Sequence, residues 1–139
     1  MKTRKTWREK LESPKPRKIV DVPERMVRQC GEGKLLIPTP LDVDAVIRQI
    51  PEGRVMTNGE LRKELARRFG ADTACPLCVG MFIRIAAEAA EERGLDKTPY
   101  WRVISDAGKL NPKLPGGVAA QAEALRREGH AVTSGRMNS

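Results

Sequence analysis

Three cysteines and one histidine are the residues of this chain best suited to nucleophilic or metal chemistry. Cys75 and Cys78 stand three apart before an alanine-rich stretch. The dipole of a helix beginning there would lower the pKa of a thiol in its first turn, so Cys75 is a candidate nucleophile. With Cys30 and His130 the pair could supply four zinc ligands, but the long separations and the lack of a second close pair disfavour zinc. The alternative role is burial as small apolar side chains.

The element that must position these cysteines is a long helix. Residues 74–93 are rich in alanine, with Thr73 as the expected N-cap, Pro76 tolerated in the first turn and Gly94 as the stop. Apolar side chains at helical spacing predict its buried face, which is Val79, Ile83, Ala86 and Ala90. A second face carries Leu77, Met81, Arg84 and Glu88.

Another amphipathic helix is predicted just before it, over residues 57–69, with Asn58 placed to cap it. Its inward side chains repeat every four residues: Leu61, Leu65 and Phe69. The connection, residues 70–72, is short and contains a glycine. This order is typical of a helix-turn-helix, although other helical hairpins share it. Thr39-Pro40 opens a third helix that runs to residue 50.

Short strands are predicted after the three helices. Residues 98–104 favour a strand, residues 106–108 are a turn signal, and Lys109-Leu110 would form the returning strand. Two short strands after a helical trio are typical of the wing of a winged helix. A last helix is expected over residues 118–128, followed by a frayed tail from His130 to Ser139.

The charge of the chain favours a polyanionic partner. Lys and Arg number 26 against 18 Asp and Glu, which gives a net charge of +8. An N-terminal arm with Lys2, Arg4 and Lys5 could contact phosphates or be solvated, and Trp7 and Leu11 could dock a short helix on the body. No apolar run is long enough to span a membrane, and no signal-peptide core follows the basic start. We therefore expect a cytoplasmic protein with reduced cysteines.

Six motifs, in order and at matching spacing over residues 40–132, resemble one known family. They are Gly53-Arg54-Val55-Met56-Thr57-Asn58-Gly59-Glu60-Leu61, Val79-Gly80, Thr98-Pro99-Tyr100-Trp101-Arg102-Val103-Ile104, Gly108, Pro115-Gly116-Gly117 and Glu128-Gly129-His130. Together they resemble the DNA-binding catalytic domain of alkylguanine-DNA alkyltransferases and their alkyltransferase-like relatives. The resemblance implies a mainly α fold with a small β wing, the winged helix-turn-helix of the alkyltransferase C-terminal domain. Such a domain binds the minor groove and turns a damaged guanine into a pocket. Residues 1–39 would be a basic N-terminal extension and residues 133–139 a C-terminal tail.

The residues that carry the family's chemistry are replaced here. The family's active-site run is Pro-Cys-His-Arg-Val, and this chain has Tyr100 at the position of the alkyl-accepting cysteine and Trp101 at that of the activating histidine. A phenol with a reference pKa of about 10 is protonated at neutral pH and is a poor alkyl acceptor without a base. Asn58 stands where the enzymes have a tyrosine. Leu77 stands where they have the arginine that fills the vacated base stack.

The resemblance also implies which residues would contact DNA. The predicted DNA-binding residues are Asn58, Leu77, Met81, Arg84 and Lys109. Leu77 could wedge between bases or be an ordinary exposed apolar residue. Tyr100 and Trp101 could line a base pocket with Arg102, or fill the core instead. Arg102 is expected to hold the strand and loop scaffold through a carboxylate.

The predicted function is non-enzymatic DNA binding of the alkyltransferase-like type, with recognition of alkylated or otherwise damaged bases for DNA repair. The expected partners are double-stranded DNA and DNA-repair proteins, with no membrane, cofactor or metal. Lys and Arg side chains would supply most of the affinity. Two alternatives stay open: a DNA-repair enzyme that uses Cys75 as a relocated nucleophile, and a winged-helix regulator or interaction module without lesion recognition.

Overall fold

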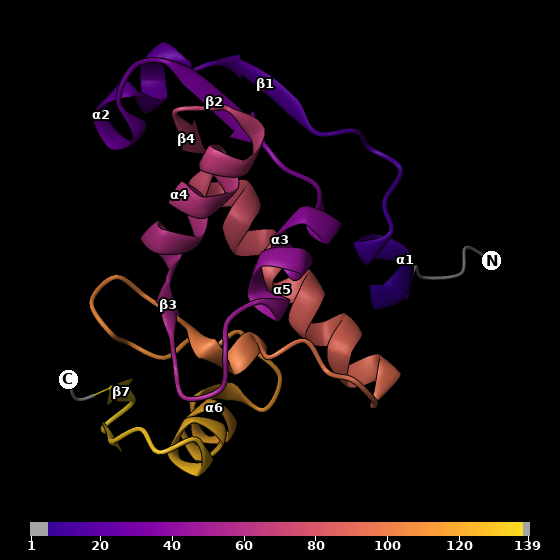
Figure 1. The fold of residues 1–139 in the computed structure, drawn as a ribbon, viewed down its shortest axis with the longest axis vertical. Coiled ribbons are helices and arrows are strands. Elements are labelled where there is room, and N and C mark those ends of the chain that lie inside the picture. The colour runs from indigo at the N-terminus through magenta and orange to yellow at the C-terminus, as the bar shows by residue number, and fades with distance from the viewer. Residues whose placement is uncertain (1–5, 138–139) are drawn as a thin grey trace.

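The computed structural model describes residues 6–137, which form a mainly helical fold with small sheets (Figure 1). Lys2, Arg4 and Lys5 of the predicted arm lie outside the described residues, as do the last two residues of the expected tail. The predicted fold class, mainly α with small β elements, is confirmed. No helix within residues 6–137 is long and apolar enough to cross a membrane.

The helices are α1 (Trp7–Leu11), α2 (Val27–Cys30), α3 (Pro40–Arg48), α4 (Asn58–Phe69), α5 (Pro76–Arg93) and α6 (Gly117–Arg127), with 3₁₀ turns at Glu24–Met26 and Tyr100–Arg102. The strands are β1 (Lys18–Asp21), β2 (Lys34–Ile37), β3 (Met56–Thr57), β4 (Thr73–Ala74), β5 (Val103–Ile104), β6 (Val132–Thr133) and β7 (Arg136–Met137).

Helix α4 begins with a capping box one residue before the predicted cap. Thr57 Oγ1 accepts the N–H of Glu60 at 3.1 Å, and Glu60 Oε1 accepts the N–H of Thr57 at 3.1 Å. The prediction of Asn58 as the cap is therefore wrong, and Asn58 is the first helical residue. The reciprocal pair prevails because it satisfies two otherwise unpaired N–H groups at once. Gly70 ends the helix in the left-handed conformation, at φ 72°.

Helix α5 begins later than predicted. Thr73 is not its cap, because Thr73 belongs to β4, which pairs with β2. The N-cap is Cys75, whose Sγ accepts the N–H of Cys78 at 3.4 Å. Pro76 occupies the first turn and Gly94 ends the helix at φ 79°, both as predicted.

The core lies where α3, α4 and α5 pack together. The predicted inward face of α5 is confirmed, since Val79, Ile83, Ala86 and Ala90 are each at most 2% exposed. Leu61 and Leu65 of α4 are fully buried, and Phe69 is half-buried. The capping box of Thr39 with Asp42 opens α3. These helices therefore fix α5 with its remaining face toward solvent.

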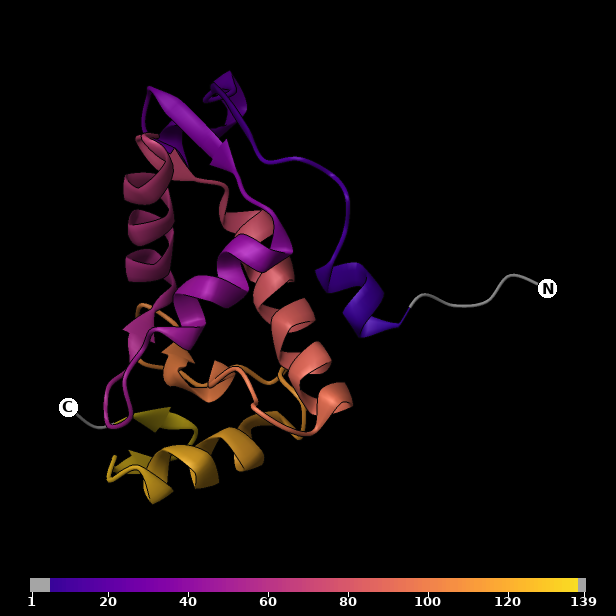
Figure 2. The same cartoon turned by 45° about the vertical axis from the view of Figure 1, so that its right-hand side comes forward.

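The segment before α3 packs on the helices (Figures 1 and 2). Strand β2 runs antiparallel to β1 and parallel to β4, with Leu35 and Leu36 buried. The predicted docking of a short helix at its start is confirmed, because Glu92 of α5 accepts the backbone N–H groups of Trp7 and Arg8 at 3.1 and 3.2 Å. The domain boundary at residue 39 stays a prediction.

The strands after α5 pair differently from the prediction. Strand β5 runs parallel to β3 rather than pairing with Lys109, which instead bridges to Arg136 of β7. The predicted turn at residues 106–108 is present, and the Ser105 N–H donates to the Lys109 carbonyl at 3.0 Å. Strands β6 and β7 form a hairpin, so the expected frayed tail is wrong for residues 133–137. The cause is the turn at Ser134-Gly135, where both φ angles are positive, as a tight two-residue hairpin requires.

Candidate nucleic-acid interface

The solvent-facing side of α5 exposes large apolar side chains near its N-terminus. Leu77 is 76% exposed and Met81 is 56% exposed. At spacings of four and seven residues, Leu77, Met81 and the exposed Arg84 share one face of the helix. Adjacent exposed apolar side chains indicate an interaction surface more often than scattered ones do. The structure thus brings three of the five predicted DNA-binding residues onto one surface.

Gly80 lies within this part of α5 and has open space around it. A Cβ atom built on Gly80 would have no atom within 4 Å, and the residue is exposed. A glycine inside a helix costs about 1 kcal/mol relative to alanine. Neither packing nor an unusual backbone angle of this protein requires glycine here. A glycine at this point suits the close approach of another molecule to the backbone of α5.

A cavity of about 420 Å³ lies beside Gly80, between α5, β5 and the loop that follows β5. Asn58 and Lys109, the two other predicted DNA-binding residues, both line it. The remaining lining residues are Val103, Ile104, Ser105, Leu110, Asn111, Pro112 and Lys113. No carboxylate occurs among these described lining residues, which combine apolar walls with two amides and two lysines. The volume falls in the range of about 300–1,000 Å³ that small-molecule sites occupy.

Tyr100 and Trp101 do not line this cavity. The Tyr100 hydroxyl donates to Glu91 Oε2 at 2.7 Å, and Trp101 Nε1 donates to Glu128 Oε2 at 2.8 Å. The two rings meet edge to face, with centroids 5.3 Å apart. Both line a separate cavity of about 380 Å³ beside α6. Two of the predicted base-pocket residues, Tyr100 and Trp101, therefore lie at a different cavity from Asn58 and Lys109.

Arg102 links the segment around Tyr100 and Trp101 to Glu128 and to Ile50. Its Nη2 donates to Glu128 Oε2 at 2.8 Å and its Nη1 to the Ile50 carbonyl at 2.6 Å. The two charged side chains are only 13% and 8% exposed. Burial would raise the pKa of Glu128, but the hydrogen bonds from Arg102 and Trp101 outweigh it and hold that pKa below its usual value. The expected scaffold role of Arg102 through a carboxylate is confirmed.

The surroundings of Tyr100 keep its phenol protonated. Burial, followed by the hydrogen bond to Glu91 and the negative charge of that carboxylate, raises the pKa of Tyr100 well above its ordinary value. The residue is 7% exposed. To act as a phenolate nucleophile, Tyr100 would have to lose the proton that its hydroxyl donates to Glu91. Tyr100 is therefore unsuited to accept an alkyl group at neutral pH.

The cysteines at the start of α5 are shielded. Cys75 is 8% exposed and lines neither the 420 Å³ nor the 380 Å³ cavity. Burial, with a further contribution from Cys75, raises the pKa of Cys78 to about 11. The lowered pKa expected from the helix dipole is thus wrong for Cys78, because loss of solvation outweighs the dipole.

The four residues considered as zinc ligands do not converge. Cys30 ends α2 and His130 follows α6, and these two helices lie at opposite ends of the molecule (Figure 1). Within residues 6–137, no three His, Cys, Asp or Glu side chains are arranged to hold a metal ion. In the same part of the chain, His130 Nε2 is buried without a hydrogen-bond partner.

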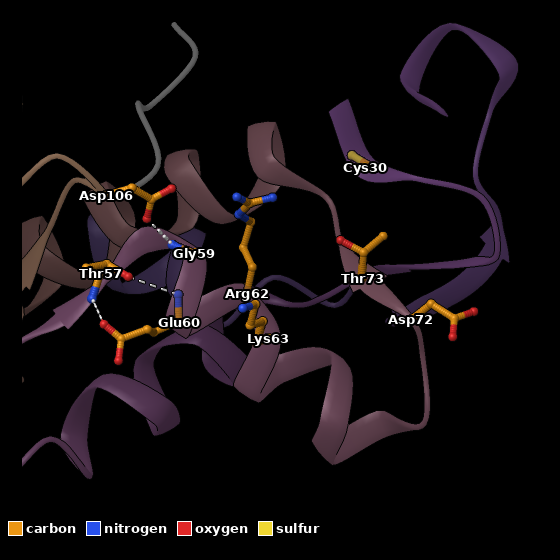
Figure 3. Close-up of a pocket in the computed structure, with 9 residues that line it drawn as sticks. All are labelled: Cys30, Thr57, Gly59, Glu60, Arg62, Lys63, Asp72, Thr73 and Asp106. Atoms are coloured by element: carbon orange, nitrogen blue, oxygen red, sulfur yellow. Dashed lines mark hydrogen bonds between the residues drawn. The ribbon is translucent and has the colours of Figure 1, made fainter. Parts of the chain in front are cut away.

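A third opening, of about 530 Å³, runs along α4, next to Cys30 and Thr73 (Figure 3). Its three carboxylates each accept a backbone N–H, at 3.1 Å for Glu60, 2.8 Å for Asp106 and 2.7 Å for Asp72. The Asp106 bond explains Gly59, whose Cβ would lie 2.9 Å from the carboxylate oxygen. Arg62 and Lys63, by contrast, have no ion pair with any described residue.

Cations line both the 420 Å³ and the 530 Å³ cavity. The ammonium groups of Lys109 and Lys113 and the side chains of Arg62 and Lys63 make no ion pair within residues 6–137, and Arg84 lies over the Trp7 ring at 5.6 Å. Other arginines are paired, as in Arg48–Asp44 and Arg127–Glu123. Unpaired cations are the groups that can neutralise phosphates.

Sequence reasoning did not identify four of these residues. Asn111 and Lys113 follow the predicted turn within a proline-containing loop, and their position directly after Lys109 was the available signal. Arg62 and Lys63 lie on α4 away from the buried Leu61 and Leu65. Helical periodicity alone could have placed them on the exposed side of the helix.

Comparisons with known proteins identify a family and one similar solved structure. The family model described as 6-O-methylguanine DNA methyltransferase, DNA binding domain, matches residues 39–130. Among solved structures, the crystal structure of S. pombe Atl1 in complex with damaged DNA containing O6-carboxymethylguanine is similar to this chain. The TM-score is 0.49 and the sequence identity 25%, over 70% of this chain and 83% of that chain. No curated protein matches the chain.

Proposed function

The chain belongs to the family of 6-O-methylguanine DNA methyltransferase DNA-binding domains, and from that premise we propose that it binds double-stranded DNA without transferring alkyl groups. The proposed target is an alkylated or otherwise damaged base, turned out of the duplex into the 420 Å³ cavity. Bound protein would mark the damaged site for DNA-repair proteins.

The observation that carries this proposal is the exposed glycine of α5 between two exposed apolar side chains. A helix that enters the minor groove needs close contact between its backbone and the duplex, and apolar wedges help to unstack a base step. Gly80 permits that contact because nothing lies within 4 Å of its Cβ position. Leu77 and Met81, 76% and 56% exposed, are suited to the wedge role.

The cavity beside Gly80 suits a base. A flipped base is read through hydrogen bonds to its edge and through contact with apolar walls. Asn58 and Asn111 offer amide donors and acceptors, and Val103 and Leu110 offer apolar surface. Lys109 and Lys113 at the same cavity would neutralise the phosphates that flank the displaced nucleotide.

The proposal that no alkyl group is transferred rests on the chemistry of Tyr100. Its hydroxyl is committed to Glu91 at 2.7 Å, and its pKa is raised. The neighbouring Trp101 donates to Glu128 and has no basic atom with which to take a proton. Neither side chain can therefore replace a cysteine activated by histidine.

Binding can be tested by fluorescence anisotropy with matched duplexes that differ by one O6-methylguanine. If the four unpaired cations Arg62, Lys63, Lys109 and Lys113 contact phosphates, the affinity should fall roughly 100-fold between about 50 and 200 mM salt, from a slope of about −0.9 per contact. The damaged duplex should bind more tightly than its control. An affinity that does not change with salt would rule out DNA binding through these cations.

Transfer can be tested by intact and peptide mass spectrometry after incubation with the same damaged duplex. We expect no added methyl group. A modified Cys75 that disappears in Cys75→Ser would instead establish the enzyme alternative. Absence of both transfer and preference for the damaged duplex would favour the regulator or interaction module.

A further inference from the structure

Cys75 and Cys78 occupy the two ends of the first turn of α5. Cys75 is the N-cap, with an extended backbone at φ −60° and ψ 116°, and its Sγ lies 3.4 Å from the Cys78 nitrogen. The Cys75 sulfur therefore lies against the backbone of Cys78, within the same turn.

This geometry suits a disulfide better than helical spacing alone. Residues three apart within a helix have Cβ atoms about 5–6 Å apart, whereas a disulfide needs roughly 3.5–4.5 Å. Cys75, as the extended N-cap, does not have helical spacing to Cys78, and its side chain turns back over the first turn to reach the Cys78 nitrogen. Cys30, the remaining cysteine, lies at the end of α2 and has no place in this turn.

We propose that Cys75 and Cys78 form a reversible disulfide by exchange with a low-molecular-weight disulfide, and that this bond weakens DNA binding by distorting the exposed turn of α5. The first half of the proposal is independent of any DNA-binding role. The second half rests on the function proposed above.

The exchange is balanced in atoms and electrons. Cys78, the more exposed of the two, loses its proton, which its raised pKa makes slow at neutral pH, and attacks one sulfur of an oxidised glutathione. The first glutathione leaves as a thiolate and takes up a proton. Cys75 then loses its proton, attacks the Cys78 sulfur of the mixed disulfide and expels the second glutathione, which is protonated in turn. Two protein thiols are oxidised to one disulfide, and one disulfide is reduced to two thiols.

The distortion would fall on Leu77. Closing the bond brings the two sulfur atoms to about 2.05 Å, so the turn between the cysteines must tighten. Pro76 cannot take up the change in φ, because its ring fixes that angle. Leu77 is the other residue inside the closed ring, and it is 76% exposed on the surface proposed to contact DNA.

The bond can be tested on the full chain equilibrated with defined ratios of oxidised to reduced glutathione, quenched with acid and alkylated at its free thiols. Peptide mapping should show a Cys75–Cys78 disulfide and an alkylated Cys30 under oxidising ratios. Cys30→Ser should form the same bond, and Cys75→Ser and Cys78→Ser should not. A serine at position 75 can still cap α5, so loss of the bond there would not reflect unfolding. Three alkylated cysteines at every ratio, or a disulfide that includes Cys30, would overturn the proposal.

The coupling can be tested with Cys30→Ser, by comparing duplex affinity in the oxidised and reduced forms. We expect about five-fold weaker binding after oxidation, full recovery with dithiothreitol and no response in Cys78→Ser. Equal affinities would overturn the coupling while leaving the disulfide in place. Failure of both forms to bind any duplex would refute the proposed function, and peptide mapping would still decide whether the disulfide forms.

Discussion

Replacing Glu128 by glutamine should destabilise the protein by about 3 kcal/mol. The Glu128 carboxylate accepts hydrogen bonds from Arg102 and from Trp101, and its side chain is 8% exposed. Removing one partner of a buried ion pair costs about 3–5 kcal/mol, because the other charge is left uncompensated. Glutamine keeps one acceptor oxygen, which places the expected loss near the lower end of that range.

Urea unfolding followed by circular dichroism at neutral pH would measure this loss as a lower midpoint with an unchanged slope. A thermal midpoint lower by roughly 6–12 °C should accompany it, at about 2–4 °C for each kcal/mol. The pKa of Glu128 is lowered in the folded state. The stability supplied by its carboxylate is therefore present above the unfolded pKa and is lost as the pH falls through the folded pKa. The difference in the free energy of unfolding between the wild type and Glu128→Gln should therefore become smaller over that acidic range.

The matched control is Glu123→Gln in α6, the helix for which Glu128 is the C-cap. Glu123 pairs with Arg127 four residues on, but the two side chains are 65% and 75% exposed. Such pairs contribute little, so the midpoint should move by no more than the error of the measurement. One contrary result would be a Glu128→Gln midpoint shifted no more than that of this control. Another would be a difference in the free energy of unfolding from the wild type that stays constant down to acidic pH. Either result would show that the buried ion pair does not stabilise the protein.

Three further predictions concern the proposed interface and its chemistry. Gly80→Ala should raise the free energy of unfolding by about 1 kcal/mol in urea titrations, because a helical glycine is removed. The same variant should bind duplex DNA more weakly, and unchanged binding would show that the backbone of α5 is not approached closely. The chain has a single tyrosine, so an ultraviolet pH titration should show ionisation of Tyr100 above its ordinary range, and a normal titration would contradict the buried bond to Glu91. Lys113→Gln should lower the magnitude of the slope of log affinity against log salt by about 0.9, whereas Arg127→Gln at the end of α6 should leave it unchanged.

Local signals in the sequence predicted much of this fold. The periodic apolar residues of α4 and α5 and the stop at Gly94 are confirmed, because each depends on residues within a few turns. The orientation of Tyr100 and Trp101 could not be predicted in this way. Their partners Glu91 and Glu128 are 9 and 27 residues away, and neither carries a sequence pattern that marks it as a hydrogen-bond acceptor.

The candidate site was also predicted only where local sequence signals determine it. Leu77, Met81 and Arg84 were placed on one face by helical spacing, and the structure agrees. The 420 Å³ cavity was not predicted, because it depends on how the loop after β5 returns toward α4 and α5. That return is set by contacts such as the Lys109–Arg136 bridge, which joins residues far apart in the chain.

Strand β2 also has a consequence for how the chain folds. It holds the connection between α4 and α5 through backbone bonds from Asp72 and Cys75, and the Lys34 N–H donates to the Asp72 carboxylate across 38 residues. The helix pair therefore cannot reach its final geometry from neighbouring residues alone, and closing so long a loop slows folding. During synthesis β2 emerges from the ribosome before β4 does. Leu35 and Leu36, buried in the finished protein, would stay uncovered through that interval, when a chaperone would be of most use.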